Sequence, residues 1–305
     1  MKQFQILSLT LMLLTIIGCS DEVTPSNFTG TTQEIREMLR GENPEQVYLV
    51  STDGFEIKTN YGTVISAAPN SFTYLDGSPY TGDFFTLGVT EVISKSDLIR
   101  YGYQTITTNG EILTSDGEYN FTAMADRELM LTPQATLELY IPNENPSNSA
   151  ILFDLSSETM TWTPRDTTPL QLGEWRFEMD DWQFGYVASL SSLDWVNVDY
   201  FTKFELPLTE VQVCLPQGYS LENTLAFAVF SDRDIVLELG ESVDNLFMAP
   251  LPLGENVHLV AITSEGGGNF RVVKKEVTIT ENLKVNLEPQ PASEEEIIAC
   301  LESLD

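Results

Sequence analysis

The residues that could carry chemistry are few in this chain. Its 305 residues include one histidine and three cysteines. His258 lies in the strand-like segment ENVHLVAIT, so we interpret it as a structural or surface residue. A zinc site needs further nitrogen or sulfur ligands, and a Ser-His-Asp triad would depend wholly on this one imidazole. The residue types therefore predict no catalytic set, no metal site and no cofactor.

Acidic side chains are abundant, with 46 Asp plus Glu in the chain. Closely spaced acids occur at Asp180-Asp181, at Asp232 and Asp234, and at 294–296. A glycoside hydrolase uses two carboxyls about 5–9 Å apart across a cleft, and Ca²⁺ takes about 6–8 oxygen ligands. Chance supplies such pairs in so acidic a chain, and we interpret them as solvated turns. A carboxylate-based hydrolase stays open as the third functional hypothesis.

Aromatic rings gather between residues 162 and 204. The alternation in WRFEM and WQFGYV favours inward-facing positions, so most of these rings are predicted to fill a core. Trp182, beside Asp180 and Asp181, is the predicted exception. An exposed ring of this kind could stack on the face of a sugar.

The charge balance excludes one class of partner. Fifteen Lys plus Arg against 46 acids give a formal charge of −31. Such a surface repels phosphate backbones, so no nucleic acid partner is expected. It also repels anionic lipid headgroups, so attachment to a membrane needs an anchor other than surface charge.

The N-terminal residues are predicted to supply that membrane anchor. A single lysine is followed by an apolar run ending at Gly18, shorter than the ~20 residues of a spanning helix, which predicts a secretory signal at 1–18. Ile16-Ile17-Gly18-Cys19 resembles the bacterial lipobox, which implies lipidation of Cys19 and attachment to a membrane. An ordinary signal peptide that happens to contain a cysteine is the alternative.

The residues after Cys19 refine the predicted location. Ser20-Asp21-Glu22 resembles the acidic export signal of Bacteroidota lipoproteins. We expect an outer-membrane lipoprotein facing the cell exterior, with a periplasm-facing one as the alternative. An exported, oxidising setting then makes Cys214 and Cys300 candidates for a disulfide, with two small buried thiols as the alternative.

Hydrophobic periodicity predicts an all-β fold of two β-sandwich-like domains. Capping-box patterns at Thr31 and Ser293 predict a short N-terminal helix at about 32–40 and a C-terminal capping helix at 294–304. Between 46 and 163 the period is two, with no long helix expected and hairpin turns expected at Asp53-Gly54, Asn109-Gly110 and Asp116-Gly117. A further hairpin is expected at Glu265–Asn269. The predicted organisation is a signal peptide at 1–18, a tether and helix at 19–44, the first sandwich at 45–163, a linker at 164–169, the second sandwich at 170–289 and the closing helix at 290–305.

Two segments carry a resemblance to a known architecture. The first segment has a glycine before an apolar pair, a Pro–small–Phe segment and a "G..L…dGe" pattern. The matching residues in this chain are Gly62, Pro69, Phe72, Asp76, Gly77, Gly82, Glu91, Gly110, Leu113, Gly117 and Glu118. This segment resembles a module of Bacteroidota lipoproteins that is similar to the ZU-type β-sandwich. LDWVNVDYFTKF at 193–204 looks like the second signature, with Asp194, Val198 and Tyr200 in place of its Gly, Cys and Arg.

The resemblance implies a surface protein without a stated activity. Some eukaryotic relatives cleave themselves at a His-Phe-Ser stretch, which this chain lacks. We therefore expect a non-enzymatic cell-surface lipoprotein with a structural or ligand-binding role and a protein or glycan partner. The alternative is a glycan-binding accessory protein of a polysaccharide-uptake system, using Trp182.

Overall fold

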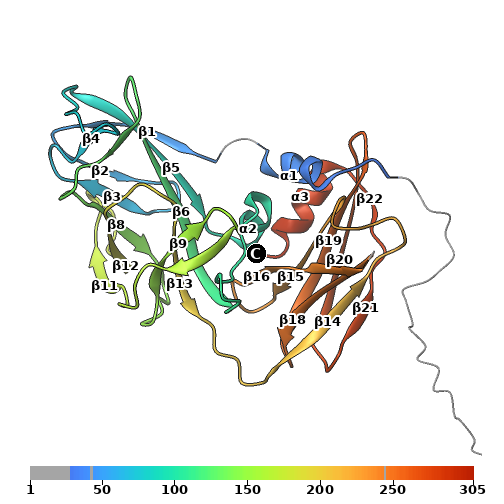
Figure 1. Cartoon of the computed structure of the whole chain (residues 1–305). Helices are drawn as coiled ribbons and strands as arrows, with labels where there is room; N and C mark the ends of the chain where they lie inside the picture. The colour runs from blue at the N-terminus through green and yellow to red at the C-terminus, as the bar shows by residue number, and fades with distance from the viewer. Residues whose placement is uncertain (1–27, 42–43, 244) are drawn as a thin grey trace, which may run out of the picture.

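The computed structural model describes residues 28–41, 44–243 and 245–305. The fold is all-β, as predicted, with strands in two face-to-face sandwiches and short helices between them (Figure 1). Within the described residues, no helix is long and apolar enough to cross a bilayer.

The first sandwich consists of a six-stranded and a five-stranded sheet. The six-stranded sheet has the order β1 (Gln46–Ser51), β5 (Phe84–Val92), β6 (Leu113–Met124), β13 (Val196–Phe201), β9 (Ile151–Ser156), β10 (Thr161–Pro164). The five-stranded sheet has the order β11 (Gln171–Trp175), β12 (Gln183–Leu190), β8 (Leu137–Pro142), β3 (Val64–Ala67), β2 (Phe55–Lys58). A small pair, β4 (Phe72–Tyr74) and β7 (Leu129–Leu131), covers one end. Side chains such as Leu87, Leu139 and Tyr186 fill the space between the sheets and are fully buried.

The second sandwich pairs a four-stranded with a five-stranded sheet. The first has the order β17 (Gly240–Val243), β18 (Leu246–Pro252), β14 (Leu208–Cys214), β21 (Lys284–Asn286). The second has the order β16 (Val236–Glu238), β15 (Thr224–Phe230), β19 (Asn256–Gly266), β20 (Asn269–Thr278), β22 (Gln290–Ala292). Val213, Phe247 and Leu259 lie in the core between them. The predicted Glu265–Asn269 turn joins β19 and β20 as a hairpin.

A third apolar layer joins the two sandwiches. It contains α1 (Thr32–Arg40), α2 (Lys95–Tyr101) and α3 (Glu294–Glu302), which lie between the two halves in Figure 1. One buried cluster includes Leu39 of α1, Phe153 and Trp162 of the first sandwich, Phe227 of the second, and Leu301 of α3. The two sandwiches therefore share a continuous core through the helices, which we call the seam.

Local signals predicted two of the three helices. Both capping boxes are formed, with Thr31 and Ser293 each accepting from the third helical residue. α2 was not predicted, because its seven residues interrupt a region of strict strand periodicity. Ser94 at its N-cap and Gly102 at its C-cap are the sequence signals that mark its ends.

The predicted boundary between the sandwiches is wrong. β11, β12 and β13 pair with strands of the first sandwich, which therefore runs to Phe201 and not to 163. The expected linker at 164–169 is a loop inside this sandwich, where the Arg165 guanidinium pairs with Asp154 at 2.6 Å. A polar, proline-rich stretch resembles a linker, but only long-range strand pairing decides which sheet the next strands join.

Two of the expected hairpin turns are wrong, because the strand residues on either side of them do not pair with each other. β1 pairs with β5 and β2 pairs with β3, so Asp53-Gly54 carries the chain from one sheet to the other. Asp116-Gly117 lies within β6 at a register shift opposite Asn197 and Asp199. Gly117 has φ 123° there, a left-handed conformation that favours glycine, and the chain makes a bulge instead of turning back.

The predicted bridge between Cys214 and Cys300 is not formed, because Cys300 is a free thiol. Cys214 ends β14, on the four-stranded sheet of the second sandwich. Cys300 lies on α3, which packs against the opposite face of the five-stranded sheet. A whole sheet therefore separates the two cysteines. Cys19 lies outside the described residues.

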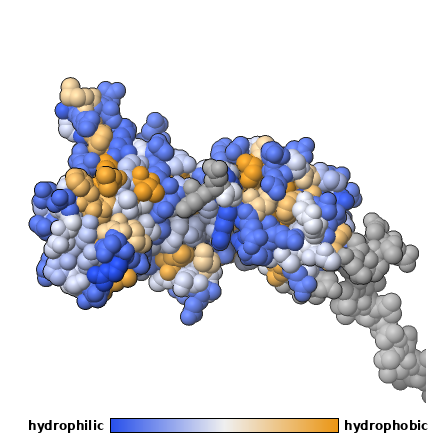
Figure 2. Space-filling model, turned by 90° about the horizontal axis from the view of Figure 1, so that it is seen from above, coloured by the Kyte–Doolittle hydropathy of each residue, from blue (hydrophilic) through white to orange (hydrophobic). Residues whose placement is uncertain are grey.

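The surface in Figure 2 is mostly hydrophilic, with separate apolar patches on both halves. This distribution agrees with acids spread along turns and strand faces in a chain of formal charge −31.

Candidate functional site

A pocket of about 400 Å³ opens at the seam, between the end of α1 and the outer face of the six-stranded sheet. We call it the seam pocket. The side chains that define it are Arg40, Glu45, Thr90, Tyr101, Tyr103, Asn120 and Trp195. Thr90 and Asn120 are paired neighbours on β5 and β6. The volume lies within the range of small-molecule sites, about 300–1,000 Å³.

Aromatic rings form one wall of the pocket. The Tyr103 and Trp195 rings have centroids 4.7 Å apart at 47°, and Trp162 lies behind Tyr103 at 5.9 Å. Gly102 ends α2 in the left-handed conformation, and the Tyr103 amide donates to Leu98 O over 2.8 Å. The end of α2 therefore fixes the direction of the wall.

The Tyr103 phenol keeps its proton. Burial, and then the nearby Glu118 carboxyl, raise its pKa well above the ordinary value of a tyrosine. A neutral phenol can donate a hydrogen bond to a ligand while its ring supplies apolar surface.

Arg40 supplies positive charge at the pocket. Six other arginines pair with carboxylates, and Arg176 lies over the Trp182 ring. Among the described residues, no carboxylate lies within ion-pair distance of Arg40. The Glu45 carboxylate accepts from Thr122 Oγ1 at 2.8 Å, on the sheet surface. The Arg40 guanidinium thus remains available in a strongly acidic molecule.

Two fully buried carboxyls, Glu118 and Asp199, lie on the same outer face of the sheet as the floor of the pocket. Glu118 lies two residues from Asn120 on β6, so both side chains point to the same side of the strand. Ser115 Oγ donates to Glu118 Oε1 at 3.3 Å, and Asn197 Nδ2 donates to Asp199 Oδ2 at 2.6 Å. In the described part of the chain, the second oxygens, Glu118 Oε2 and Asp199 Oδ1, have no hydrogen-bond partner.

Burial sets the protonation of this pair. It raises the pKa of both carboxyls well above the ordinary range, and the charge of Asp199 raises the pKa of Glu118 further. Hydrogen bonds from Ser115 and Asn197 oppose the shift only in part. The protonated, neutral form is therefore favoured, and the pair cannot reach a substrate because both side chains are fully covered.

The structure brings the two signature segments of the sequence together at this pair. Glu118 follows the Gly117 bulge in the first segment, and Asn197 opposite it belongs to the second. The contact, and with it Asp199, was not predicted, because the pairing joins residues about 80 positions apart. Glu91 lies on the other face of the sheet, where Gln46 Nε2 donates to it at 2.9 Å and burial raises its pKa.

Trp182 is exposed, as predicted, with 65% of its surface accessible, while Trp162 and Trp175 are buried. The Arg176 guanidinium lies 5.4 Å from its ring centroid. Lys58 Nζ pairs with Asp180 at 2.5 Å and holds the loop that carries the ring. Met179 in the same loop is almost fully exposed. This loop offers an open aromatic surface but no enclosed pocket.

The other predicted candidates do not form a chemical site. His258 lies on β19 between Val229 and Glu276, and burial and Lys274 lower its pKa. Burial raises the pKa of Asp234, which the Lys95 charge opposes. Glu294 and its neighbours form the first turn of α3. In the part of the chain that the structure describes, no group of three or more His, Cys, Asp or Glu could hold a metal ion.

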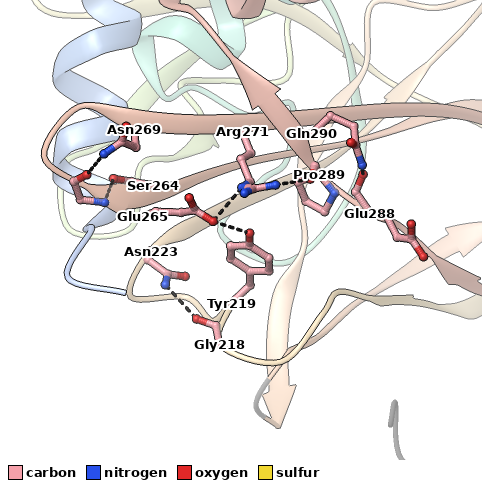
Figure 3. Close-up of polar contacts among 11 residues, drawn as sticks. Gly218, Tyr219, Asn223, Ser264, Glu265, Asn269, Arg271, Glu288, Pro289 and Gln290 are labelled. Atoms are coloured by element: carbon pink, nitrogen blue, oxygen red, sulfur yellow. Dashed lines mark hydrogen bonds and ion pairs between the residues drawn. The ribbon is translucent and has the colours of Figure 1, made fainter. Parts of the chain in front are cut away.

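The start of the described chain is fixed on the second sandwich. Phe28 stacks on Tyr219 with centroids 4.9 Å apart, and Thr29 N donates to Glu265 O. Figure 3 shows the polar network around Tyr219, in which the Glu265 carboxylate accepts from Tyr219 Oη at 3.1 Å and from Arg271 Nε at 2.7 Å. The β19–β20 hairpin is thus the point at which the N-terminal segment meets the body.

Comparison of the chain with models of known protein families gives no match, and comparison with curated protein sequences gives none at the significance required.

Proposed function

We propose that this chain is a non-enzymatic cell-surface lipoprotein that binds a ligand in the seam pocket. The observation that carries the proposal is the pocket itself, where the Tyr103 and Trp195 rings and the Arg40 guanidinium meet on a continuous core. A rigid framework with a partly apolar pocket and a few placed polar groups is the usual form of a binding site.

The arrangement of the acids supports binding over catalysis. Glu118 and Asp199 are two carboxyls that the fold places together, and both are fully buried. Glu45, the carboxylate at the pocket, accepts a hydrogen bond from Thr122. A hydrolase would need two accessible carboxyls across one cleft.

Lipidation of Cys19 would orient the molecule. Eight residues, 20–27, separate Cys19 from the contact of Phe28 with Tyr219. Fully extended, they span at most about 30 Å. The hairpin of the second sandwich would then lie near the membrane, with the seam pocket and the first sandwich beyond it.

Membrane attachment is tested by fractionating cells that express the chain. We expect Cys19→Ala to move the protein from the membrane to the soluble fraction, because the lipid is the anchor. Cys300→Ala, which removes a free thiol, is the matched control and should stay in the membrane. Membrane retention of Cys19→Ala would contradict the lipid anchor.

Ligand binding is tested on an array of surface polysaccharides and their oligosaccharides. Binding of the protein to a glycan on the array that is lost in Trp195→Ala and kept in Trp182→Ala supports the seam pocket as the binding site. The second candidate function, a glycan-binding accessory protein, rests on the exposed Trp182 and predicts the opposite pattern. Turnover of a glycan or peptide that a point substitution abolishes would overturn the non-enzymatic proposal.

A further inference from the structure

We propose that the seam pocket takes a sugar ring that bears one carboxylate, of the uronic acid type. This inference rests on the proposed function, because it names the ligand class of the same pocket. Three features carry it: the charge of Arg40, the aromatic wall, and the polar groups of the sheet floor.

The first feature is the Arg40 guanidinium, which has no ion-pair partner within residues 28–41, 44–243 and 245–305. In a chain of formal charge −31, the other arginines of the described residues are neutralised by carboxylates or cover an aromatic ring. Arg40 ends α1 at the mouth of the pocket and has neither kind of partner among the residues that the structure describes. A guanidinium binds a carboxylate through two parallel hydrogen bonds, so a ligand carboxylate fits this position.

The second feature is the wall formed by Tyr101, Tyr103 and Trp195. Flat rings offer apolar faces on which the C–H face of a sugar ring can lie. Their polar tips, the Tyr103 phenol among them, remain donors because the phenol keeps its proton. An aromatic wall with donors at its edge fits a polyhydroxylated ring better than an alkyl chain.

The third feature is the floor, where the Thr90 hydroxyl and the Asn120 amide lie side by side on β5 and β6. Each can both donate and accept, as a sugar hydroxyl does. The floor is part of a sheet whose inner face packs on the buried core of the first sandwich, so these groups are preorganised.

The same features argue against ligands of higher charge. A nucleotide or other polyphosphate brings several negative charges, and the pocket offers a single cation within a highly acidic molecule. One carboxylate matches one guanidinium. The volume of about 400 Å³ accommodates one or two sugar rings.

The test uses a pair of ligands that differ in one group. Cellobiouronic acid and cellobiose are titrated calorimetrically into the full-length protein in detergent. We expect the acid to bind at least tenfold more tightly. Arg40→Gln should abolish this preference, while Arg127→Gln, which removes an exposed arginine paired with Asp76, should leave it intact. Raising the salt concentration should weaken binding of the acid more than of cellobiose.

The outcomes separate the two proposals. Equal affinity for both disaccharides, lost in Trp195→Ala, would overturn the carboxylate inference and leave the seam pocket as the binding site. A preference for the acid that survives Arg40→Gln would also overturn the inference. Failure of both disaccharides to bind, together with failure of every glycan on the array, would overturn the proposed function as well.

Discussion

The fold buries the carboxyls of Glu118 and Asp199, and this burial costs free energy. Neither side chain is accessible, and each leaves one oxygen without a hydrogen-bond partner. The Gly117 bulge aims Glu118 into the seam, and Asn197 pairs with the neighbouring carboxyl. A charge there would be uncompensated, so the fold is more favourable when the pair is protonated.

This reasoning predicts the pH dependence of a Glu118→Gln variant. The folded-state pKa of Glu118 is raised, so its contribution to stability is present below the unfolded-state pKa of about 4.3 and is lost as pH rises. The variant removes the charge and keeps the shape. At pH 8 we expect the free energy of unfolding of the variant to be higher than that of the wild type by about 1–3 kcal/mol. Near pH 4 the two free energies of unfolding should be almost equal.

Urea unfolding at both pH values measures the difference. Glu56→Gln, at an exposed position on β2, is the control and should change stability equally at the two pH values. A Glu118→Gln variant that is less stable than the wild type at pH 8 would contradict the protonated pair.

Among the elements, α2 depends on contacts from both ends of the sequence. It has only seven residues, and Ser94 caps its first turn. The Asp305 carboxylate accepts from Ser96 N at 2.9 Å and from Ser96 Oγ at 2.6 Å. A short helix has little stability alone, so these contacts and the apolar layer hold it in place.

Asp305→Ala is expected to destabilise the protein by about 1–2 kcal/mol, since it removes a carboxylate that caps the start of a helix. Chemical denaturation at pH 7 measures the loss. Glu302→Ala, an exposed acid at the end of α3, should change stability by much less. Equal effects of the two substitutions would show that the Asp305 contact does not stabilise α2.

The success of prediction also differs from element to element. Local signals were sufficient for α1 and α3, whose capping boxes lie within four residues of sequence. Local signals failed for Asp53-Gly54, because the residues of a turn do not determine whether the two strands beside it pair with each other. The seam pocket could not be predicted, since Arg40, Asn120 and Trp195 meet only after two sheets and a helix have packed.

Trp182 could be predicted because its neighbours in sequence already indicate exposure. Asp180 and Asp181 precede it directly, and Trp182 itself lies before the first residue of β12. The fully buried Trp162 and the partly covered Trp195 come from equally polar surroundings in sequence, and long-range contacts decide their burial.

On the scale of the whole molecule, the seam makes the two sandwiches one unit. Its buried cluster takes side chains from both sandwiches and all three helices of the described residues. Backbone bonds cross it as well, such as Thr105 N to Val236 O at 2.9 Å. Neither sandwich buries its seam-facing side chains without the other.

We therefore predict a single calorimetric unfolding transition with equal calorimetric and van't Hoff enthalpies. Leu301→Ala, which truncates a fully buried side chain of α3, should cost about 2–5 kcal/mol and shift the whole transition. Leu206→Ala, at an exposed position, should shift it little. Two separate transitions, of which Leu301→Ala shifts one, would show that the sandwiches unfold independently.

The central claim is that a ligand binds at the seam and not on the exposed loop. The four tryptophans give four indole N–H signals in a ¹⁵N-labelled sample, and Trp195 and Trp182 lie at the two competing sites. Acidic oligosaccharides are titrated into the protein while these signals are recorded. We predict that the Trp195 signal shifts and saturates, that it no longer does so in Arg40→Gln, and that the Trp182 signal stays in place. A Trp182 shift with an unchanged Trp195 signal would contradict the account.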